Sequence, residues 1–294
     1  MAKPTLHTYT KGAKSPADLI SHLQVKGLQV PDTAAAQRVI ETTGYFRLLI
    51  YMRVMQDPGS KQFLAGTSFE DILKLYEFDR KLRLHCLDAI ERIEVGLRAA
   101  IINEVAVPHG AHFYLNPAHF GNVEAYRAFF AKAIQARYLA IEHYHKKYSN
   151  PPSPPIWAIC EAITFGTLSH LYSGLNLANR KAAAKPFGFD ETVLVSWFRT
   201  LNDLRNTCAH HNRLWDKSML VNQPTRAKAF SSELATVAQQ RFYGRAIVLG
   251  ALLNKLDPGY LWRTELVTLI GASPTVPLAN MAFPADWRTR PFWA

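Results

Sequence analysis

Apolar residues recur at three- and four-residue steps along most of this chain, which is the period of amphipathic helices. The longest such pattern runs from Ser68 to about Val105 and forms one stripe of Phe78, Leu82, Ile90, Ile93, Leu97 and Ile101. Caps and stop signals predict shorter helices from Ser15 to Gly27 and from Asp32 to Gly44, and a buried helix over 45–56.

Four later segments also read as helices, and the rest reads as loops. The helices are expected over 122–147, 156–175, Asp190 to at least Ala209, and 231–256. The proline-rich segment 149–155 is expected to be a loop, and the Pro- and Trp-rich tail 272–294 to pack irregularly. No strand-like alternation is present. We therefore expect an all-α protein of eight or so helices that forms one domain over 1–294. The helices over 15–56 and the tail are expected to pack on the core of this domain.

A dense polar cluster, RNTCAHHNRLW, ends the helix that begins after Asp190 and occupies 205–215. At about 100° per residue, the apolar residues before it form a seam suited to packing on another helix. Asn206 and His210, four apart, share a helix face, whereas Arg205 and His210, five apart, point in different directions. One chain therefore aims this pair poorly at a single atom, unless the helix distorts or a second copy completes the site.

Arg plus His, without paired carboxylates or metal ligands, suits transfer at a phosphodiester. An imidazole can move the proton of a ribose 2′-hydroxyl or of the leaving 5′-oxygen, and a guanidinium can hold the phosphate. Arg205 and His210 are thus candidate catalytic residues, with Asn206 positioning the phosphate or His210, and His211 or Arg213 assisting on RNA. The same spacing is also met by an ordinary polar helix end, in which basic side chains favour the C-terminus.

Overall charge, hydropathy and cysteine content indicate the class of partner and the cellular compartment. The net charge of +11 makes nucleic acid or an anionic membrane surface a leading partner. No apolar run is long enough to span a bilayer, and residues 1–14 hold no signal-peptide core, so we expect a cytoplasmic protein with no membrane partner. Three widely spaced cysteines predict reduced thiols rather than a disulfide framework.

Motifs for bound cofactors and metals do not occur. The sequence has no GxxxxGK[ST], GxSxG or HExxH, so no small-molecule cofactor is expected. A metal site at Cys208, His210 and His211 is disfavoured because adjacent histidines point apart on a helix and no second ligand pair is suitably spaced.

Charged residues on the longest helix allow two readings. Asp79 with Arg83 and Glu94 with Arg98 are four-apart pairs typical of a solvated, self-paired face. Alternatively, Arg80, Arg83 and Arg98 border an RNA groove, or Glu91 and Glu94 orient a basic group of the site. Elsewhere, HYHKKY (143–148) can contact phosphates or lie on an ordinary surface, and Trp157 fits a core position.

Five stretches together resemble the Abi family of abortive-infection proteins, of the AbiD/AbiF type, over nearly the whole chain. They are GYFRLLIY (44–51), LYEFDRKLRLHCLDAIERIEVGLRA (75–99), PPIWAICEAITFGTLSHLY (154–172), LRNTCAHHNRLW (204–215) and MAFPADW (281–287). Ala282 stands where the closing motif would have glycine, a departure expected to affect only a turn.

The resemblance implies properties that the residues alone do not establish. The family is grouped with HEPN proteins, all-helical and commonly dimeric, whose R-x4-6-H motif forms a metal-independent RNase site at the dimer interface. Arg205 and His210 match that motif, with Asn206 in its frequent polar place. The resemblance thus implies a homodimeric endoribonuclease leaving 2′,3′-cyclic phosphates, a phage-defence or toxin-like role, and restraint by a small non-coding RNA. A non-catalytic RNA-binding protein and a helical dimerisation scaffold stay open as alternatives.

Overall fold

The structure, a computed structural model, describes residue 8 and residues 12–235 and 237–294. It divides into two compact units, one ending at Phe78 and one running from Asp79 to Ala294. Because the units are not placed relative to one another, the single domain over 1–294 and the packing of helices 15–56 on the core stay predictions. The stretch 1–14, in which we expected no signal peptide, lies largely outside the described residues.

The first unit holds three short helices: α1 (Pro16–Val25), α2 (Thr33–Thr43) and α3 (Tyr45–Met52). Ser15 and Asp18 form the predicted start of α1 as a capping box, and Gly44, at φ 87°, ends α2. The predicted helix over 45–56 is shorter, since a 3₁₀ turn η1 (Arg53–Met55) follows Met52. Only one face of α3 is buried, and Phe46 is 78% exposed.

The longest helix, α4 (Phe69–Ile101), begins in the first unit and continues in the second. Every residue of the predicted apolar stripe is at most 1% exposed, so the periodicity identified the buried face correctly. Beyond Ile101 the helix widens into a π-helical turn, η2 (Ile102–Ala106), and ends in α5 (Val107–His109) before Gly110.

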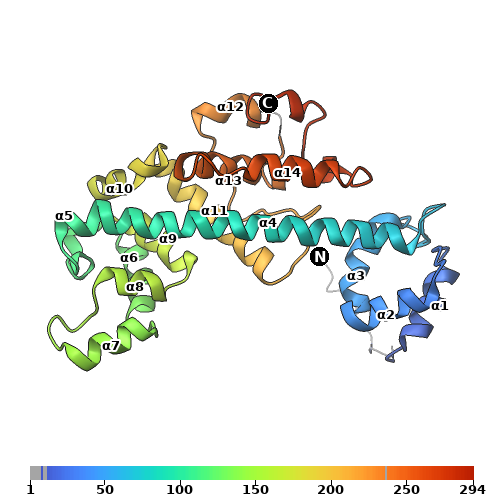
Figure 1. Ribbon diagram of the computed structural model, residues 1–294, viewed down its shortest axis with the longest axis horizontal. Helices are drawn as coiled ribbons and strands as arrows, with labels where there is room; N and C mark the ends of the chain where they lie inside the picture. Colours follow the sequence, from blue (N-terminus) through green and yellow to red (C-terminus); the bar gives the residue numbers. More distant parts are fainter. Residues whose placement is uncertain (1–7, 9–11, 236) are drawn as a thin grey trace. The chain divides into compact units, whose positions relative to one another are not determined.

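Within the second unit, α13 (Phe242–Leu256) and α14 (Trp262–Gly271) run alongside α4 (Figure 1). Gly96 allows this approach, because a Cβ there would lie 2.9 Å from a methyl group of Leu256. His85 stacks on Trp262 with ring centroids 4.9 Å apart and ring planes 3° from parallel.

Among the remaining helices of the second unit, α6 packs on α9 and α9 packs on α11. The helices are α6 (Val123–Ala133), α7 (Leu139–Lys147), α8 (Ile156–Ala162), α9 (Phe165–Gly174), α10 (Leu177–Ala184), α11 (Glu191–Ala209) and α12 (Ser231–Leu234). Short 3₁₀ turns are η3 (Phe113–Leu115), η4 (Pro117–His119), η5 (Lys185–Phe187), η6 (Lys228–Phe230), η7 (Leu278–Met281) and η8 (Trp287–Thr289).

Three predicted helices are interrupted in the structure. The segment 122–147 breaks between α6 and α7 without a glycine or proline, so tertiary packing overrides local propensity there. The segment 156–175 breaks because the Thr164 side chain caps α9, accepting from the Thr167 N–H at 3.3 Å. The segment 231–256 is broken between α12 and α13, and the helices α10 and α14 were not predicted.

The fold class is confirmed as all-α with more than eight helices, and no strand occurs among the described residues. The tail 272–294 contains only 3₁₀ turns and packs through aromatic side chains on α13, where the Trp293 indole donates to the Tyr243 hydroxyl at 3.1 Å. In the part of the chain that is described, no helix has the length and apolar character that crossing a bilayer requires.

Candidate functional site

The helix α11 carries the candidate site and begins and ends as predicted. The Asp190 carboxylate caps its start by accepting from the Thr192 N–H at 2.8 Å, and the last helical residue is Ala209. Its seam is buried to 1% exposure or less and consists of Leu194, Trp197, Leu201, Leu204 and Cys208. The polar cluster therefore begins where a firmly packed helix leaves the core.

The end of α11 is a Schellman turn built by His210, His211 and Asn212. The His211 N–H donates to the Cys208 carbonyl and the Asn212 N–H to the Thr207 carbonyl, both at 3.0 Å. His211 takes the left-handed position of this motif, at φ 57°, which glycine usually occupies. Two consecutive histidines are thus held in different directions at a defined helix end.

The three predicted catalytic residues lie at this end without contacting one another as a set. His210 is the C-cap residue and is exposed, whereas Arg205 and Asn206 are half-buried one turn earlier. The Arg205 guanidinium reaches the Asn206 amide oxygen at a long 3.5 Å. Within the described chain, no hydrogen bond joins Arg205 to His210, in agreement with the helical projection.

A carboxylate network on α4 and α8 lies beside Arg205. Glu94 accepts from Arg98 at 2.6 Å, and Arg98 also pairs with Glu161 at 3.7 Å. Burial raises the pKa of Glu94, and the positive charges of Arg98 and Arg205 oppose that rise. Glu94 and Arg205 therefore attract each other electrostatically, and the reading in which Glu91 and Glu94 orient a basic group of the site stays a prediction.

The predicted RNA-binding residue Arg98 is held within this network. Its side chain is 17% exposed and also donates to the Ile163 carbonyl at 3.4 Å. Two carboxylates thus offset its charge in one chain, which favours a role in fixing Glu94 rather than a free phosphate contact.

Asp79 on α4 fixes the segment that follows the Schellman turn. Its carboxylate accepts the backbone N–H of Leu214 at 3.0 Å and of Trp215 at 2.6 Å, and it pairs with Arg83. Asp79 and Arg83 are 0% and 4% exposed. Their interpretation as a solvated face is therefore wrong, and burial also argues against Arg83 as an RNA contact.

The other predicted RNA-binding residues differ in accessibility. Arg80 and His211 are exposed. Arg213 is half-buried, pairs with Asp216 at 3.7 Å and lies 6.0 Å over the Trp215 ring. Arg213 is thereby directed along the turn beyond His211.

A buried arginine that the sequence analysis did not identify holds the chain after α11 in place. Arg245 on α13 is 0% exposed and donates to the carbonyls of Met219 at 3.2 Å and Asn222 at 2.8 Å. The Asn222 amide in turn donates to Asp203 of α11 at 2.6 Å. Burial lowers the pKa of Arg245 to about 10, and Asp203 opposes this shift.

Sequence signals for these supporting residues existed. Asp79 and Arg83 fall on the apolar stripe of α4 next to Leu82, and Arg245 stands alone in the apolar run FYGRAIVLGALL. A charged residue in such a register is a candidate for a buried, fully bonded role. Among the described residues, no three His, Cys, Asp or Glu side chains gather as a set of metal ligands, so Cys208, His210 and His211 do not form one.

The arrangement presents an exposed imidazole at a rigid helix end, with a half-buried guanidinium one turn away. Chemically, it offers a proton-transfer group and an anion-holding group on one firmly packed helix. In the described chain, no hydrogen bond joins these two side chains.

A family model described as "Abi-like protein" matches residues 38–216, which is more than half of the 294-residue chain. No curated protein and no solved structure matches this chain. The match contains Asp79, Glu94, Arg98 and the whole α11 segment through Asp216, and leaves the MAFPADW stretch outside. Membership fits a role in abortive infection, and on this match the chain belongs to the Abi-like protein family.

Proposed function

We propose that this protein is a metal-independent endoribonuclease of the HEPN type that acts in abortive infection as a homodimer. The observation that carries the proposal is the placement of Arg205 and His210 at the fixed end of α11, without mutual contact in one chain. Family membership supports the defence role.

In the proposed reaction, an imidazole of His210 takes the proton of a ribose 2′-hydroxyl, whose oxygen attacks the adjacent phosphorus. The bond to the 5′-oxygen breaks, that oxygen takes a proton from a His210 imidazolium, and a 2′,3′-cyclic phosphate is left. Arg205 holds the phosphate and offsets the charge that develops on its oxygens, while Asn206 orients Arg205. RNA brings its own nucleophile, so the protein supplies only proton transfer and charge stabilisation.

A second copy of the chain completes the site in this proposal, with two copies of Arg205 and His210 meeting across a two-fold axis. Exposed apolar side chains beside the Glu94 network support such an interface. Val95, next to Glu94, is 48% exposed, and so is Trp157, one turn before Glu161 on α8. Trp157 was expected in the core, and an exposed tryptophan of this kind is typical of an interface.

The first experiment measures cleavage of mixed single-stranded RNA in EDTA and identifies the product ends. Arg205→Ala and His210→Ala are expected to abolish cleavage, whereas the exposed-residue controls Arg199→Ala and His170→Ala keep it. Cleavage by purified His210→Ala at the unaltered rate contradicts the assignment.

Mixing the two inactive variants tests whether the site is shared. A mixed dimer of Arg205→Ala and His210→Ala keeps one arginine and one histidine, contributed by different chains. If the site lies across the interface, refolding the two variants together restores part of the activity. If each chain holds its own site, the mixture stays inactive.

The alternative function is a non-catalytic RNA-binding protein of a defence system, favoured by the net charge of +11. RNA that copurifies with the protein discriminates the two. One discrete intact RNA with no cleavage of other RNAs favours binding alone, and fragments with cyclic phosphate ends favour the nuclease. A discrete RNA that inhibits cleavage when added back supports restraint by a small non-coding RNA.

A further inference from the structure

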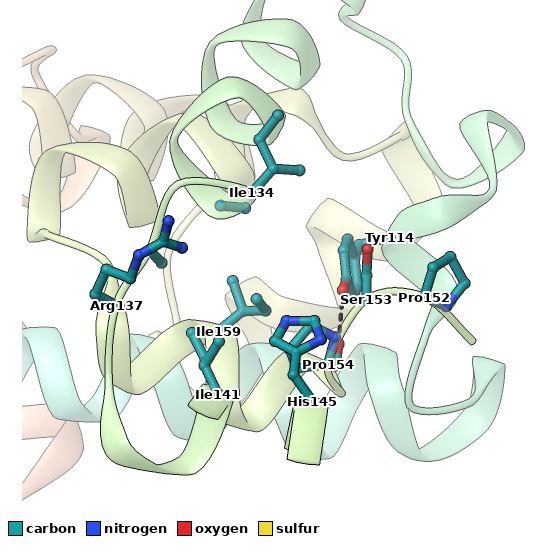
Figure 2. Close-up of a pocket in the computed structure, with 11 residues that line it drawn as sticks. Tyr114, Ile134, Arg137, Ile141, His145, Pro152, Ser153, Pro154 and Ile159 are labelled. Carbon is teal, nitrogen blue, oxygen red and sulfur yellow. Dashed lines mark hydrogen bonds between the residues drawn. The ribbon is translucent and has the colours of Figure 1, made fainter. Parts of the chain in front are cut away.

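A pocket of about 160 Å³ lies in the second unit where the end of α6, the α6–α7 link, α7 and α8 meet (Figure 2). Its apolar side is formed by Ile134, at the end of α6, Ile141 of α7 and Ile159 of α8. Ile141 and Ile159 are buried, whereas Ile134 is 57% exposed at the opening. The break between α6 and α7, which local sequence did not predict, creates this pocket.

The polar side of the pocket is cationic and hydroxylic. Arg137, in the α6–α7 link, and His145 of α7 lie on two sides of the isoleucines in Figure 2. Arg137 is exposed, and within the described chain no hydrogen bond or ion pair joins its guanidinium to another residue. No carboxylate lines the pocket, so its charge is complementary to an anion.

One wall of the pocket is fixed in place before any ligand arrives. The Tyr114 hydroxyl donates to the Pro154 carbonyl at 2.6 Å, and burial raises the pKa of Tyr114 to about 12, which keeps it a donor. The neighbouring Ser153 also lines the pocket, and its side-chain hydrogen bond with Tyr114 partly opposes the rise in the Tyr114 pKa. An apolar floor with a few convergent polar groups is the usual composition of a small-molecule site.

We propose that this pocket binds one nucleotide, with its phosphate on Arg137, its base against Ile134, Ile141 and Ile159, and base-edge contacts to His145 or Ser153. The volume lies below the roughly 300–1,000 Å³ of drug-sized pockets and suits one base rather than a dinucleotide. Sites for single-stranded RNA combine cationic groups with side chains on which bases pack; those side chains are usually aromatic, and in this pocket they are aliphatic.

Basic residues beside the pocket extend this surface along a nucleic-acid backbone. Lys146 and Lys147 follow His145 at the exposed end of α7, and Lys132 precedes the pocket on α6. The HYHKKY run, which the α11 site does not use, thereby gains a role as an anchor for single-stranded RNA. Where the nucleotide is part of an RNA chain, this proposal rests on the proposed ribonuclease function and describes how the protein holds its RNA substrate.

The experiment measures binding to the full chain of two probes: the four nucleoside 5′-monophosphates by calorimetry, and a fluorescent deoxyhexanucleotide of mixed sequence by anisotropy. The deoxy probe has no 2′-hydroxyl, so its binding is read independently of cleavage. Arg137→Ala is expected to weaken binding about tenfold or more, as loss of one charge-assisted contact does. The control Arg127→Ala removes the same charge from an exposed α6 position outside the pocket and should change affinity less than about twofold.

A second variant blocks the pocket without disturbing the core. Ile134→Glu places a carboxylate at the exposed opening beside Arg137 and should reduce binding as much as Arg137→Ala does. Binding of monophosphates with this sensitivity identifies a free nucleotide as ligand, and binding of the hexanucleotide alone identifies a nucleic-acid chain; both support the proposal. Absence of binding by either probe, or binding equally affected by Arg127→Ala, overturns it.

The two proposals fail separately in these measurements. If Arg137→Ala binds the hexanucleotide normally while His210→Ala loses RNA cleavage, the pocket assignment falls and the nuclease stands. If neither the parent protein nor any variant cleaves RNA but Arg137→Ala still weakens nucleotide binding, the pocket assignment stands and the nuclease assignment falls.

Discussion

The buried carboxylate of Asp79 accepts the backbone N–H of Trp215 at 2.6 Å, which joins α4 directly to the turn that follows the candidate site. The same carboxylate pairs with Arg83 and accepts the Leu214 N–H. Two stretches far apart in sequence, FDRKLR and NRLW, thus form one anchoring unit. These contacts fix the path of the chain after the end of α11.

Asp79→Asn is expected to lower the free energy of unfolding of the second unit by about 3–5 kcal/mol, because it leaves Arg83 buried without a counter-charge. Tryptophan fluorescence during urea unfolding measures this unit, since all six tryptophans lie beyond residue 79. Glu91→Gln, an exposed change on the same helix, is the control and should alter stability by less than about 0.5 kcal/mol. A comparable effect of both substitutions would show that Asp79 is not an anchor.

Glu94→Gln is expected to slow RNA cleavage about tenfold, since the carboxylate that attracts Arg205 and holds Arg98 loses its charge. The matched control is Glu161→Gln, which removes the same charge from the more exposed partner of Arg98 and should leave cleavage within about twofold. Rates are compared at saturating RNA. Equal losses in the two variants would mean that Glu94 acts only through the general charge of the region.

Glycine at position 211 should give a more stable protein than alanine does, because His211 has φ 57°. His211→Gly is expected to be about 1 kcal/mol more stable than His211→Ala in urea unfolding. At position 210, with φ −84°, the order should reverse, and His210→Ala should be the more stable of the pair. The same order at both positions would be incompatible with the Schellman turn.

Ala282→Gly is expected to stabilise the protein by about 1 kcal/mol, because Ala282 is left-handed at φ 62°. This is the position at which the resemblance to the Abi family expects glycine. Ala279→Gly, at an exposed helical position of η7, serves as the comparison and should destabilise by about 0.5–1 kcal/mol. Thermal unfolding of the three proteins at pH 7.5 provides the measurement, and a loss of stability in Ala282→Gly would refute the expectation.

Acidification is expected to destabilise the second unit partly through His85. This histidine stacks on Trp262, and its burial lowers its pKa. The unfolded chain then binds more protons than the folded one below the ordinary pKa of 6.5, so this stabilising contribution is complete above 6.5 and is lost as the pH falls. His85→Gln should show a shallower loss of stability between pH 8 and pH 5 than the parent. Identical pH dependence in the two proteins would exclude His85 as a contributor.

Local sequence determined much of the secondary structure and the location of the candidate site. Ser15, Asp32 and Asp190 start helices where predicted, because a side-chain oxygen that satisfies free backbone N–H groups acts within one turn. The buried stripe of α4 and the seam of α11 follow from periodicity alone. Helical geometry also established that Arg205 and His210 diverge.

Tertiary structure decided what the charged residues do. Asp79 and Arg83 are spaced like a solvated ion pair, although their register falls on the apolar stripe of α4, and only the arrival of the Leu214–Trp215 backbone makes their burial favourable. Likewise, the break between α6 and α7, the pocket beside Arg137 and the attraction between Glu94 and Arg205 depend on contacts between distant segments. Propensity and periodicity act over a few residues, whereas desolvation and charge pairing depend on what packs opposite, which this sequence specifies only through the folded chain.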